Sequence, residues 1–362
     1  EICRYLPRRY QLEYDPKRET LITVGGSEAI DIAMRAMLDE GDEVLVPEPS
    51  YVSYVPCVLL ADGVPVRIEL KEENQFRLTR EQLLEKITDR TKMLILPYPN
   101  NPTGAVMRRE DLEAVAEVVR EHDLFVLSDE IYSELTYGEE HVSIASLPGM
   151  RERTLTINGF SKAFAMTGWR VGYVCGPAEM ISVLNKIHQY GIMCAPRMGQ
   201  VAAEAALRRG RENGYEDVLV MRESYDRRRR LMVESFRSLG LHCFEPYGAF
   251  YVFPSIARYG MDAREFCARL LREAAVAVTP YQEEKHSEQE QYHDSDMGTS
   301  EHQQTGAEMT DNGTDYRYSA SGTASFLDAL DVLNSGNPVV DPEEEAFRRK
   351  MQRKRKKRSH PR

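Results

Sequence analysis

Apolar runs alternate with amphipathic segments between residues 42 and 176, and this alternation constrains the fold more than any other feature. The runs predict strands at residues 43–46, 64–70, 92–96, 124–128, 154–157 and 170–175, and helices at 80–87, 109–122 and 178–190. Near-continuous apolar strands joined by helices are typical of a largely parallel sheet with both faces covered. We therefore expect an α/β fold with helices on both sides of the sheet.

Polar side chains follow three of these predicted strands at the point where each strand ends. Asn101 follows the strand at 92–96, Asp129 and Tyr132 follow the strand at 124–128, and Lys162 follows the strand at 154–157. Ligands bind beyond the carboxyl ends of parallel strands, so we expect these side chains to meet at one edge of the sheet. Each alone is more often a turn or structural residue, but together they favour a ligand site.

Lys162 is the centre of the predicted site. It lies in SKAFAMTGWRVG, residues 161–172, where a glycine-containing turn and Arg170 follow it. A lysine amine forms a Schiff base with a carbonyl once burial or nearby cations lower its pKa. The planar guanidinium of arginine suits a phosphate. The pair favours a covalently held aldehyde cofactor that carries a phosphate; the alternative is a surface lysine beside a turn.

A second anion-binding signal precedes this region. A predicted strand at residues 21–24 leads into Gly-Gly-Ser-Glu at 25–28, and then into a helix that Gly41 ends. The free N–H groups and the dipole of such a helix start attract anions. Ser27 could cap the helix or bind phosphate, and a plain capped helix is an alternative. Tyr51, after the strand at 43–46, is either a core tyrosine or an aromatic surface that stacks on a flat cofactor ring.

Charge and composition exclude several classes of function. The net charge of −11 at pH 7 argues against a general nucleic-acid-binding protein. No apolar run approaches the roughly 20 residues that span a bilayer, and no signal peptide is recognisable, so we expect a cytoplasmic protein without a membrane partner. Six cysteines without a Cys-x-x-Cys pair and eight histidines without paired spacing predict reduced thiols and no metal site.

The pattern changes after residue 195, where long helical segments begin. Two short strands are predicted within 241–254, turning at Gly248, followed by a helix at 263–273 and a strand at 276–278. We expect a large domain at residues 1–215 and a small α+β domain at 216–280. The acidic, low-complexity segment 281–314 is predicted to be disordered, 315–335 to complete the small domain, and 336–362 to be a basic tail. We interpret this tail as solvated rather than as a nucleic-acid patch.

The motifs GGSEAI, PSYVSY, NNPTG, SDEIY and SKAFAMTGWRVG, in this order and spacing, closely resemble the class I aminotransferases. These are fold-type-I pyridoxal-phosphate (PLP) enzymes, and the chain is most similar to their prokaryotic aspartate/aromatic/alanine-type branch. The resemblance covers about residues 1–280. It implies the PLP-dependent transferase fold, with a mostly parallel sheet sandwiched by helices and a smaller α+β domain. It also implies a cytoplasmic homodimer in amino-acid metabolism.

The resemblance further implies catalytic roles. Lys162 would form a Schiff base with PLP and move the proton at the substrate Cα. Asp129 would pair with the ring nitrogen of PLP, because a buried carboxylate favours the protonated ring that accepts the carbanion's electrons. Asn101 and Tyr132 would hydrogen-bond the phenolic oxygen of the ring, Asn101 would also contact the substrate, and Tyr51 would stack on the ring.

The phosphate of PLP would be held by a separate group of residues. The resemblance assigns this role to Gly26, Ser27, Glu28 (through its backbone), Ser161 and Arg170. Many relatives carry a phosphate-binding serine three residues before the lysine; Gly159 stands there in this chain, and Ser161 either replaces that serine or does not. Arg317, in YRYSAS, resembles the arginine that binds the substrate carboxylate.

The implied function is a PLP-dependent aminotransferase that moves an amino group from an L-amino acid to a 2-oxo acid. One alternative is other PLP chemistry on the same fold, such as that of a C–S lyase or a decarboxylase. Another is a truncated, catalytically inactive remnant. It is motivated by the absence of the family's N-terminal arm before Glu1 and by the acidic segment that makes the C-terminal part atypical.

Overall fold

The computed structural model describes residues 1–281, and these belong to two compact units. The first unit comprises Glu1–Ser255, and the second begins at Ile256. The large sheet belongs to the first unit. The domain borders expected from the sequence, after residues 215 and 280, stay predictions, and residues 282–362 lie outside the described part of the chain.

The first unit is built on a sheet of seven strands: β1 (Thr20–Thr23), β2 (Glu43–Glu48), β3 (Val64–Glu69), β4 (Thr91–Leu96), β5 (Phe125–Asp129), β6 (Thr154–Gly159) and β7 (Gly172–Cys175). Their order in the sheet is β1-β7-β6-β5-β4-β2-β3. Neighbouring strands from β3 to β6 are parallel, whereas β7 is antiparallel to both β6 and β1. The largely parallel α/β sheet predicted from the sequence is therefore confirmed.

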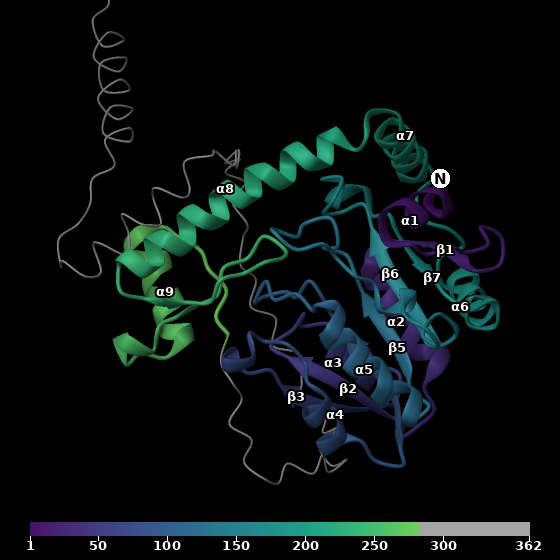
Figure 1. Ribbon diagram of the computed structural model, residues 1–362, viewed down its shortest axis with the longest axis horizontal. Helices are drawn as coiled ribbons and strands as arrows, with labels where there is room; N and C mark the ends of the chain where they lie inside the picture. Colours follow the sequence, from purple (N-terminus) through teal and green to yellow (C-terminus); the bar gives the residue numbers. More distant parts are fainter. Residues whose placement is uncertain (282–362) are drawn as a thin grey trace, which may run out of the picture. The chain divides into compact units, whose positions relative to one another are not determined.

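Helices pack on both faces of this sheet (Figure 1). Those of the first unit are α1 (Ile2–Tyr10), α2 (Gly25–Met37), α3 (Tyr54–Leu59), α4 (Arg80–Lys86), α5 (Arg109–Glu121), α6 (Ala178–Gly191), α7 (Arg197–Asn213) and α8 (Glu216–Ser238). Because strand side chains alternate between faces, Leu94 and Leu96 of β4 pack with α4 and α5, whereas Met93 packs with α2, α3 and α6. Helices α1 and α7 pack together against Tyr173 of β7. The sheet is thus buried on both faces.

Two helices differ from the sequence-based expectation. Helix α2 begins at Gly25, with Val24 as its N-cap, so Ser27 lies inside the first turn and does not cap the helix. The same helix ends at Met37 rather than near Gly41, because Leu38 adopts an extended conformation with ψ 140°. Helix α3 was not predicted, since the sequence YVPCVL is apolar throughout and shows no helical periodicity.

The two short strands predicted within 241–254 are present in part, but the tight turn predicted at Gly248 is wrong. Strands β8 (His242–Cys243) and β9 (Pro254–Ser255) pair antiparallel, but the residues between them form a long connection. Within it, the backbone N–H of Gly248 donates to the carbonyl of Gly104 at 2.8 Å, and that of Ala249 donates to the carbonyl of Leu135 at 2.9 Å. These bonds join the connection to the loops that follow the strands of the large sheet, rather than closing a tight hairpin.

The second unit contains α9 (Ala263–Ala274), which begins at Ala263 as predicted from the apolar pattern. The Asp262 carboxylate caps this helix by accepting from the N–H of Arg264 at 2.8 Å. The strand predicted at 276–278 is wrong, because the chain leaves α9 through a left-handed Ala275 and no strand pairs there. Short 3-10 helices lie at Glu72–Asn74, Ile144–Ser146, Arg151–Arg153, Thr167–Trp169 and Ala257–Tyr259.

The described residues contain neither a membrane-spanning helix nor a metal-binding cluster. No helix within residues 1–281 is both long enough and apolar enough to cross a membrane. Nor does that part of the chain bring three or more His, Cys, Asp or Glu side chains together in an arrangement that could hold a metal ion.

Candidate active site

Two neighbouring parallel strands carry predicted site residues to the same edge of the sheet. Strand β5 ends at Asp129, which lies in register with Ile157 of β6. Strand β6 continues to Gly159, shortly before Lys162 in the chain. The sheet therefore brings a carboxylate and an amine together from distant parts of the sequence, as parallel pairing requires.

Asp129 is a buried acid, with 7% of the residue exposed. Its Oδ2 accepts a hydrogen bond from the Tyr54 hydroxyl at 2.8 Å, and its Oδ1 accepts one from the Ile131 backbone N–H at 3.2 Å. Burial raises the pKa of this carboxyl above its ordinary value, and the two hydrogen bonds offset only part of the shift. A cation placed beside Asp129 would therefore stabilise its ionised form.

The Lys162 amine is partly buried among aromatic rings. Its Nζ lies 5.5 Å from the ring centroid of Tyr132 and 5.2 Å from that of Phe250. Burial lowers the pKa of this amine, Tyr51 and Asp129 oppose the shift, and the charge of Arg170 adds to it. The lowered pKa increases the fraction of free amine, which is the form that attacks a carbonyl carbon.

Arg170 and the start of α2 form an anion-binding arrangement. The guanidinium lies so close to Gly25 that a Cβ there would overlap it, and it donates to the carbonyl of Thr167 at 3.2 Å. A Cβ at Gly172 would lie 2.5 Å from the carbonyl carbon of Gly25, so β7 and α2 approach through glycines. The first N–H groups of a helix have no partner within it. A positive side chain beside such a helix start is suited to a phosphate.

Tyr51 and Asn101 lie at the loops that follow β2 and β4. The Tyr51 ring packs edge-on against that of Tyr54, with centroids 5.7 Å apart, and its phenol acts electrostatically on Lys162. Asn101 is partly exposed in a turn that its buried neighbour Asn100 stabilises: the Asn100 side chain donates to the carbonyl of Pro49 at 3.2 Å. Tyr51 therefore belongs to the group around the amine, whereas the structure gives Asn101 no contact with that group.

Ser161 and Glu28, two further predicted phosphate-binding residues, are both held by hydrogen bonds within the chain. Ser161 is buried, and its backbone carbonyl accepts from the Thr167 hydroxyl at 3.0 Å. The Glu28 carboxylate accepts from the backbone N–H of Val24 at 2.5 Å and lies 2.7 Å from His188 Nδ1. The side chain of Glu28 thus connects the start of α2 to α6.

Three aromatic residues at the site were not predicted. The hydroxyl of Tyr54 binds Asp129, the ring of Phe250 lies beside Lys162, and the hydroxyl of Tyr251 is 2.6 Å from that of Tyr132. Tyr54 could have been suspected, because it lies in the same PEPSYVSY stretch as Tyr51. Phe250 and Tyr251 were assigned to a hairpin strand, and their apolar surroundings in the sequence give no sign of a site.

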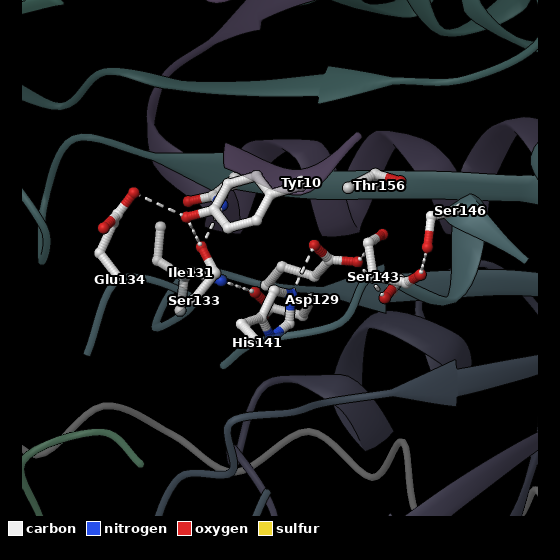
Figure 2. A network of polar contacts seen from close by, with 12 residues as sticks. Tyr10, Asp129, Ile131, Ser133, Glu134, His141, Ser143, Ser146 and Thr156 are labelled. Carbon is white, nitrogen blue, oxygen red and sulfur yellow. Dashed lines mark hydrogen bonds and ion pairs between the residues drawn. The ribbon is translucent and has the colours of Figure 1, made fainter. Parts of the chain in front are cut away.

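A buried polar network lies behind the two strand ends (Figure 2). The Glu134 carboxylate accepts hydrogen bonds from Arg9 and Tyr10 of α1, the latter at 3.0 Å. The Ser133 hydroxyl donates to the Tyr10 hydroxyl at 2.8 Å and accepts from the Asn158 amide at 2.9 Å. The network therefore connects α1 to the loop after Asp129 and to the end of β6.

A second buried carboxylate, that of Glu130, stabilises the same loop from the other side. It accepts from Ser128 at 2.9 Å and from Ser143 at 2.6 Å, and it lies 2.9 Å from His141 Nε2. The residue next to Asp129 is thus fixed by three side chains. Such buried, fully bonded groups hold a neighbouring side chain in one position.

Arg317, the predicted ligand of a substrate carboxylate, lies outside the described residues. The roles of all the predicted site residues follow from the resemblance and stay proposals. Of the described charged members, Asp129 and Arg170 both act on the pKa of the Lys162 amine, in opposite directions. We therefore describe the three as one candidate site.

Comparison with known proteins identifies the family of the chain. The family described as "Aminotransferase class I and II" matches residues 1–289. The aspartate aminotransferase of Pyrococcus abyssi is 45% identical over 280 residues, which are 77% of this chain and 72% of that protein. The aromatic-amino-acid aminotransferase 2 of Thermococcus litoralis is 44% identical over 270 residues, covering 74% of this chain and 69% of the relative.

The fold has similar solved structures as well. The crystal structure of an aromatic aminotransferase from Pyrococcus horikoshii OT3 superposes with a TM-score of 0.75 at 45% identity, covering 77% of this chain and 74% of that one. Identity of this degree over most of both chains shows a common family as well as a common fold. The chain belongs to the aminotransferases of class I and II and is an enzyme of the transaminase type.

Proposed function

We propose that this chain is a PLP-dependent aminotransferase that moves an amino group from an L-amino acid to a 2-oxo acid, with Lys162 as the residue that binds the cofactor covalently. One observation carries the proposal. A partly buried lysine amine with a lowered pKa lies beside aromatic rings, in one site with a buried aspartate and an arginine. The supporting likeness is to relatives that are themselves named aminotransferases.

The residues of the site fit PLP on their own chemistry. Asp129 is a buried acid whose raised pKa a cationic ring nitrogen would lower. Lys162 offers a free amine to the aldehyde, and Arg170 with the start of α2 offers a positive guanidinium and N–H groups to the phosphate. A flat, anionic, aldehyde-bearing molecule with a basic ring nitrogen satisfies all three sets at once.

When bound, PLP supplies an electron sink for the negative charge left at the substrate Cα. The residues of the chain perform the other tasks. Lys162 would remove the proton from the substrate Cα and deliver it to C4′ of the cofactor, and with the 2-oxo acid it would carry the proton in the reverse direction. Asp129 keeps the ring nitrogen protonated, and Tyr132 donates to the phenolic oxygen of the ring.

The remaining proposed contacts position the cofactor and the substrate. Tyr51 covers the ring, while the backbone of Gly26, Ser27 and Glu28, the side chain of Arg170 and, as a weaker candidate, Ser161 hold the phosphate. Asn101 approaches the phenolic oxygen and the substrate, and Arg317 binds the substrate carboxylate. The names of the relatives point to aspartate and aromatic amino acids as the first donors to test.

We also propose that the enzyme works as a cytoplasmic homodimer. Support comes from a group of large apolar side chains at the end of α6 and the start of α7. Tyr190 is 92% exposed, Met193 is 81% exposed and Met198 is 77% exposed. Exposed apolar groups gathered in this way are typical of surfaces that bind another protein.

The experiment that tests the function is a cofactor titration followed by a substrate panel. Purified protein is mixed with PLP, and the visible absorbance band of lysine-bound cofactor is recorded before and after addition of each amino acid. Lys162→Ala is expected to lack the band, whereas Lys186→Ala, which changes an exposed lysine of α6, is expected to retain it. A band of full strength in Lys162→Ala would contradict the assignment of the lysine.

A product assay separates transamination from other PLP chemistry. An aminotransferase releases a 2-oxo acid only in proportion to the amino acceptor supplied. A C–S lyase releases ammonia and a decarboxylase releases carbon dioxide, each without an acceptor. Sustained release of either product without an added 2-oxo acid would contradict the proposed reaction.

A further inference from the structure

Two phenols meet beside the Lys162 amine. The hydroxyl oxygens of Tyr132 and Tyr251 are 2.6 Å apart, and their rings meet edge to face at 74°. Tyr132 is buried and Tyr251 is partly buried. A separation of 2.6 Å is at the short end of the range for O–H···O hydrogen bonds, so one of these hydroxyls donates to the other.

The position of Tyr251 is fixed by the backbone that precedes it. Ala249 adopts a left-handed conformation with φ 56°, and its carbonyl accepts from the Tyr137 hydroxyl at 2.5 Å. The N–H of Tyr137 in turn donates to the carbonyl of Tyr247 at 2.9 Å. A non-glycine residue rarely adopts such a φ unless its surroundings require it. The connection is therefore built to present Phe250 and Tyr251 to the site.

A phenol carries a single hydrogen, so the direction of the bond between the two hydroxyls has a consequence. If Tyr132 donates to Tyr251, its hydrogen is not available to any ligand. If Tyr251 donates to Tyr132, the hydrogen of Tyr132 can point to an oxygen bound beside Lys162. A hydrogen bond to an anionic oxygen is about twice as strong as a neutral one, so an anionic ligand oxygen selects the second arrangement.

We propose that Tyr251 is a positioning residue that donates to Tyr132 and thereby directs the Tyr132 hydrogen to the phenolic oxygen of the cofactor. This inference rests on the proposed function, because it concerns the ring oxygen of PLP. In the chain Tyr251–Tyr132–oxygen, each bond polarises the next, so Tyr251 makes Tyr132 a stronger donor. Burial raises the pKa of both hydroxyls, so both carry their hydrogens at neutral pH.

The test is a pH titration of the visible band of PLP bound to the full chain, in wild type and in Tyr251→Phe. The substitution keeps the ring and removes one O–H. Without it, Tyr132 stabilises the deprotonated ring oxygen less well, and the midpoint of the titration is expected to rise by about 0.5 to 1 pH unit. Tyr225→Phe is the matched control, since that ring packs against Phe250 and its midpoint is expected to stay within about 0.2 units.

A double substitution shows whether Tyr251 acts through Tyr132. Tyr132→Phe is expected to raise the midpoint further than Tyr251→Phe does, and the double variant is expected to match Tyr132→Phe alone. Equal, additive shifts would mean that Tyr251 acts directly on the cofactor and would overturn the positioning role. Thermal unfolding of each variant shows that the shifts occur in folded protein.

The possible outcomes separate this inference from the function on which it rests. A wild-type protein that forms no visible band with PLP contradicts the proposed function and this inference with it. A normal band whose midpoint is unchanged in Tyr251→Phe contradicts the inference alone. A midpoint that falls in Tyr251→Phe also overturns it, because the hydrogen of Tyr132 would then have been directed to Tyr251 in the wild type.

Discussion

Asp129→Asn is expected to stabilise the cofactor-free protein while it removes most of the activity. An ionised carboxylate in a protein interior costs several kcal/mol, and each hydrogen bond to it offsets about 1.5–3 kcal/mol. Asp129 accepts from Tyr54 and from the Ile131 N–H, and burial still raises its pKa, so its ionised form opposes folding.

The asparagine amide preserves both contacts without the charge. Its oxygen accepts from the Ile131 N–H as Oδ1 does now, and its NH₂ group donates to the Tyr54 oxygen. We expect the free energy of unfolding of the cofactor-free protein to rise by about 1 kcal/mol, within the range typical of relieving a strained active site. For a chain of this size, that corresponds to an increase of about 1–2 °C in Tm.

The pH dependence of the effect follows from the raised pKa. A carboxyl whose pKa is higher in the folded than in the unfolded state favours folding while protonated, and this contribution is lost as pH rises through the folded-state pKa. The advantage of Asp129→Asn is therefore largest at neutral pH. It is expected to disappear below about pH 3.9, the ordinary pKa of aspartate.

The assay is thermal unfolding of both proteins with and without PLP, combined with measured turnover. PLP is expected to raise the Tm of wild type more than that of the variant, because only the carboxylate gains from a cationic ring nitrogen. Turnover is expected to fall about 100-fold or more, as after the loss of other electrostatic groups in active sites. Asp31→Asn, at a surface ion pair with Arg35, is the control and is expected to change stability by less than about 0.5 kcal/mol.

Two results would refute this reasoning. A cofactor-free Asp129→Asn protein that is less stable than wild type at neutral pH would mean that the carboxylate is fully compensated in the fold. An equal gain in Tm with PLP in both proteins would mean that no cationic group of the cofactor lies at Asp129.

Three further predictions concern the rest of the site. Glu134→Gln is expected to lower the free energy of unfolding by about 3 kcal/mol. Burial acts to raise the pKa of Glu134, but Arg9 and the phenols bring it below the ordinary value, so the loss should shrink in thermal melts below about pH 4.3. Gly172→Ala is expected to weaken PLP binding at least about tenfold in a cofactor titration, with Gly168→Ala, where the added Cβ meets nothing within 4 Å, unchanged. Met193→Asp is expected to halve the molar mass measured by light scattering; an unchanged mass would place the dimer contact elsewhere.

The sequence predicted the sheet well because its strands are buried on both faces. In a run such as Met93–Leu96 every side chain is apolar, so a strand with this sequence must be buried on both faces. The alternation of such runs with amphipathic helices leaves few other folds. The tight turn at Gly248 failed because the apolar residues of this segment have partners elsewhere in the chain: the rings of Phe244 and Phe253 pack against Phe76. A local pattern does not reveal a partner that far away in the chain.

The candidate site was predictable where residues follow strand ends and unpredictable where they arrive from loops. Asp129 and Lys162 follow directly from strand positions. Tyr251 reaches the site through a connection whose course depends on backbone bonds, and Glu134 is indistinguishable in sequence from a surface acid. Its burial depends on α1, which lies more than a hundred residues earlier in the chain.

The pairing of β1 with β7 at the edge of the sheet sets the earliest time at which the start of α2 and β7 can meet during synthesis on the ribosome. Thr20 pairs with Cys175, which lies 155 residues later, and the start of α2 approaches Gly172 of the same strand. At about 5–20 residues per second, translation of that interval takes about 8–31 s. The Arg170 side chain and the start of α2 can therefore come together only in the later part of synthesis, after β7 has been made.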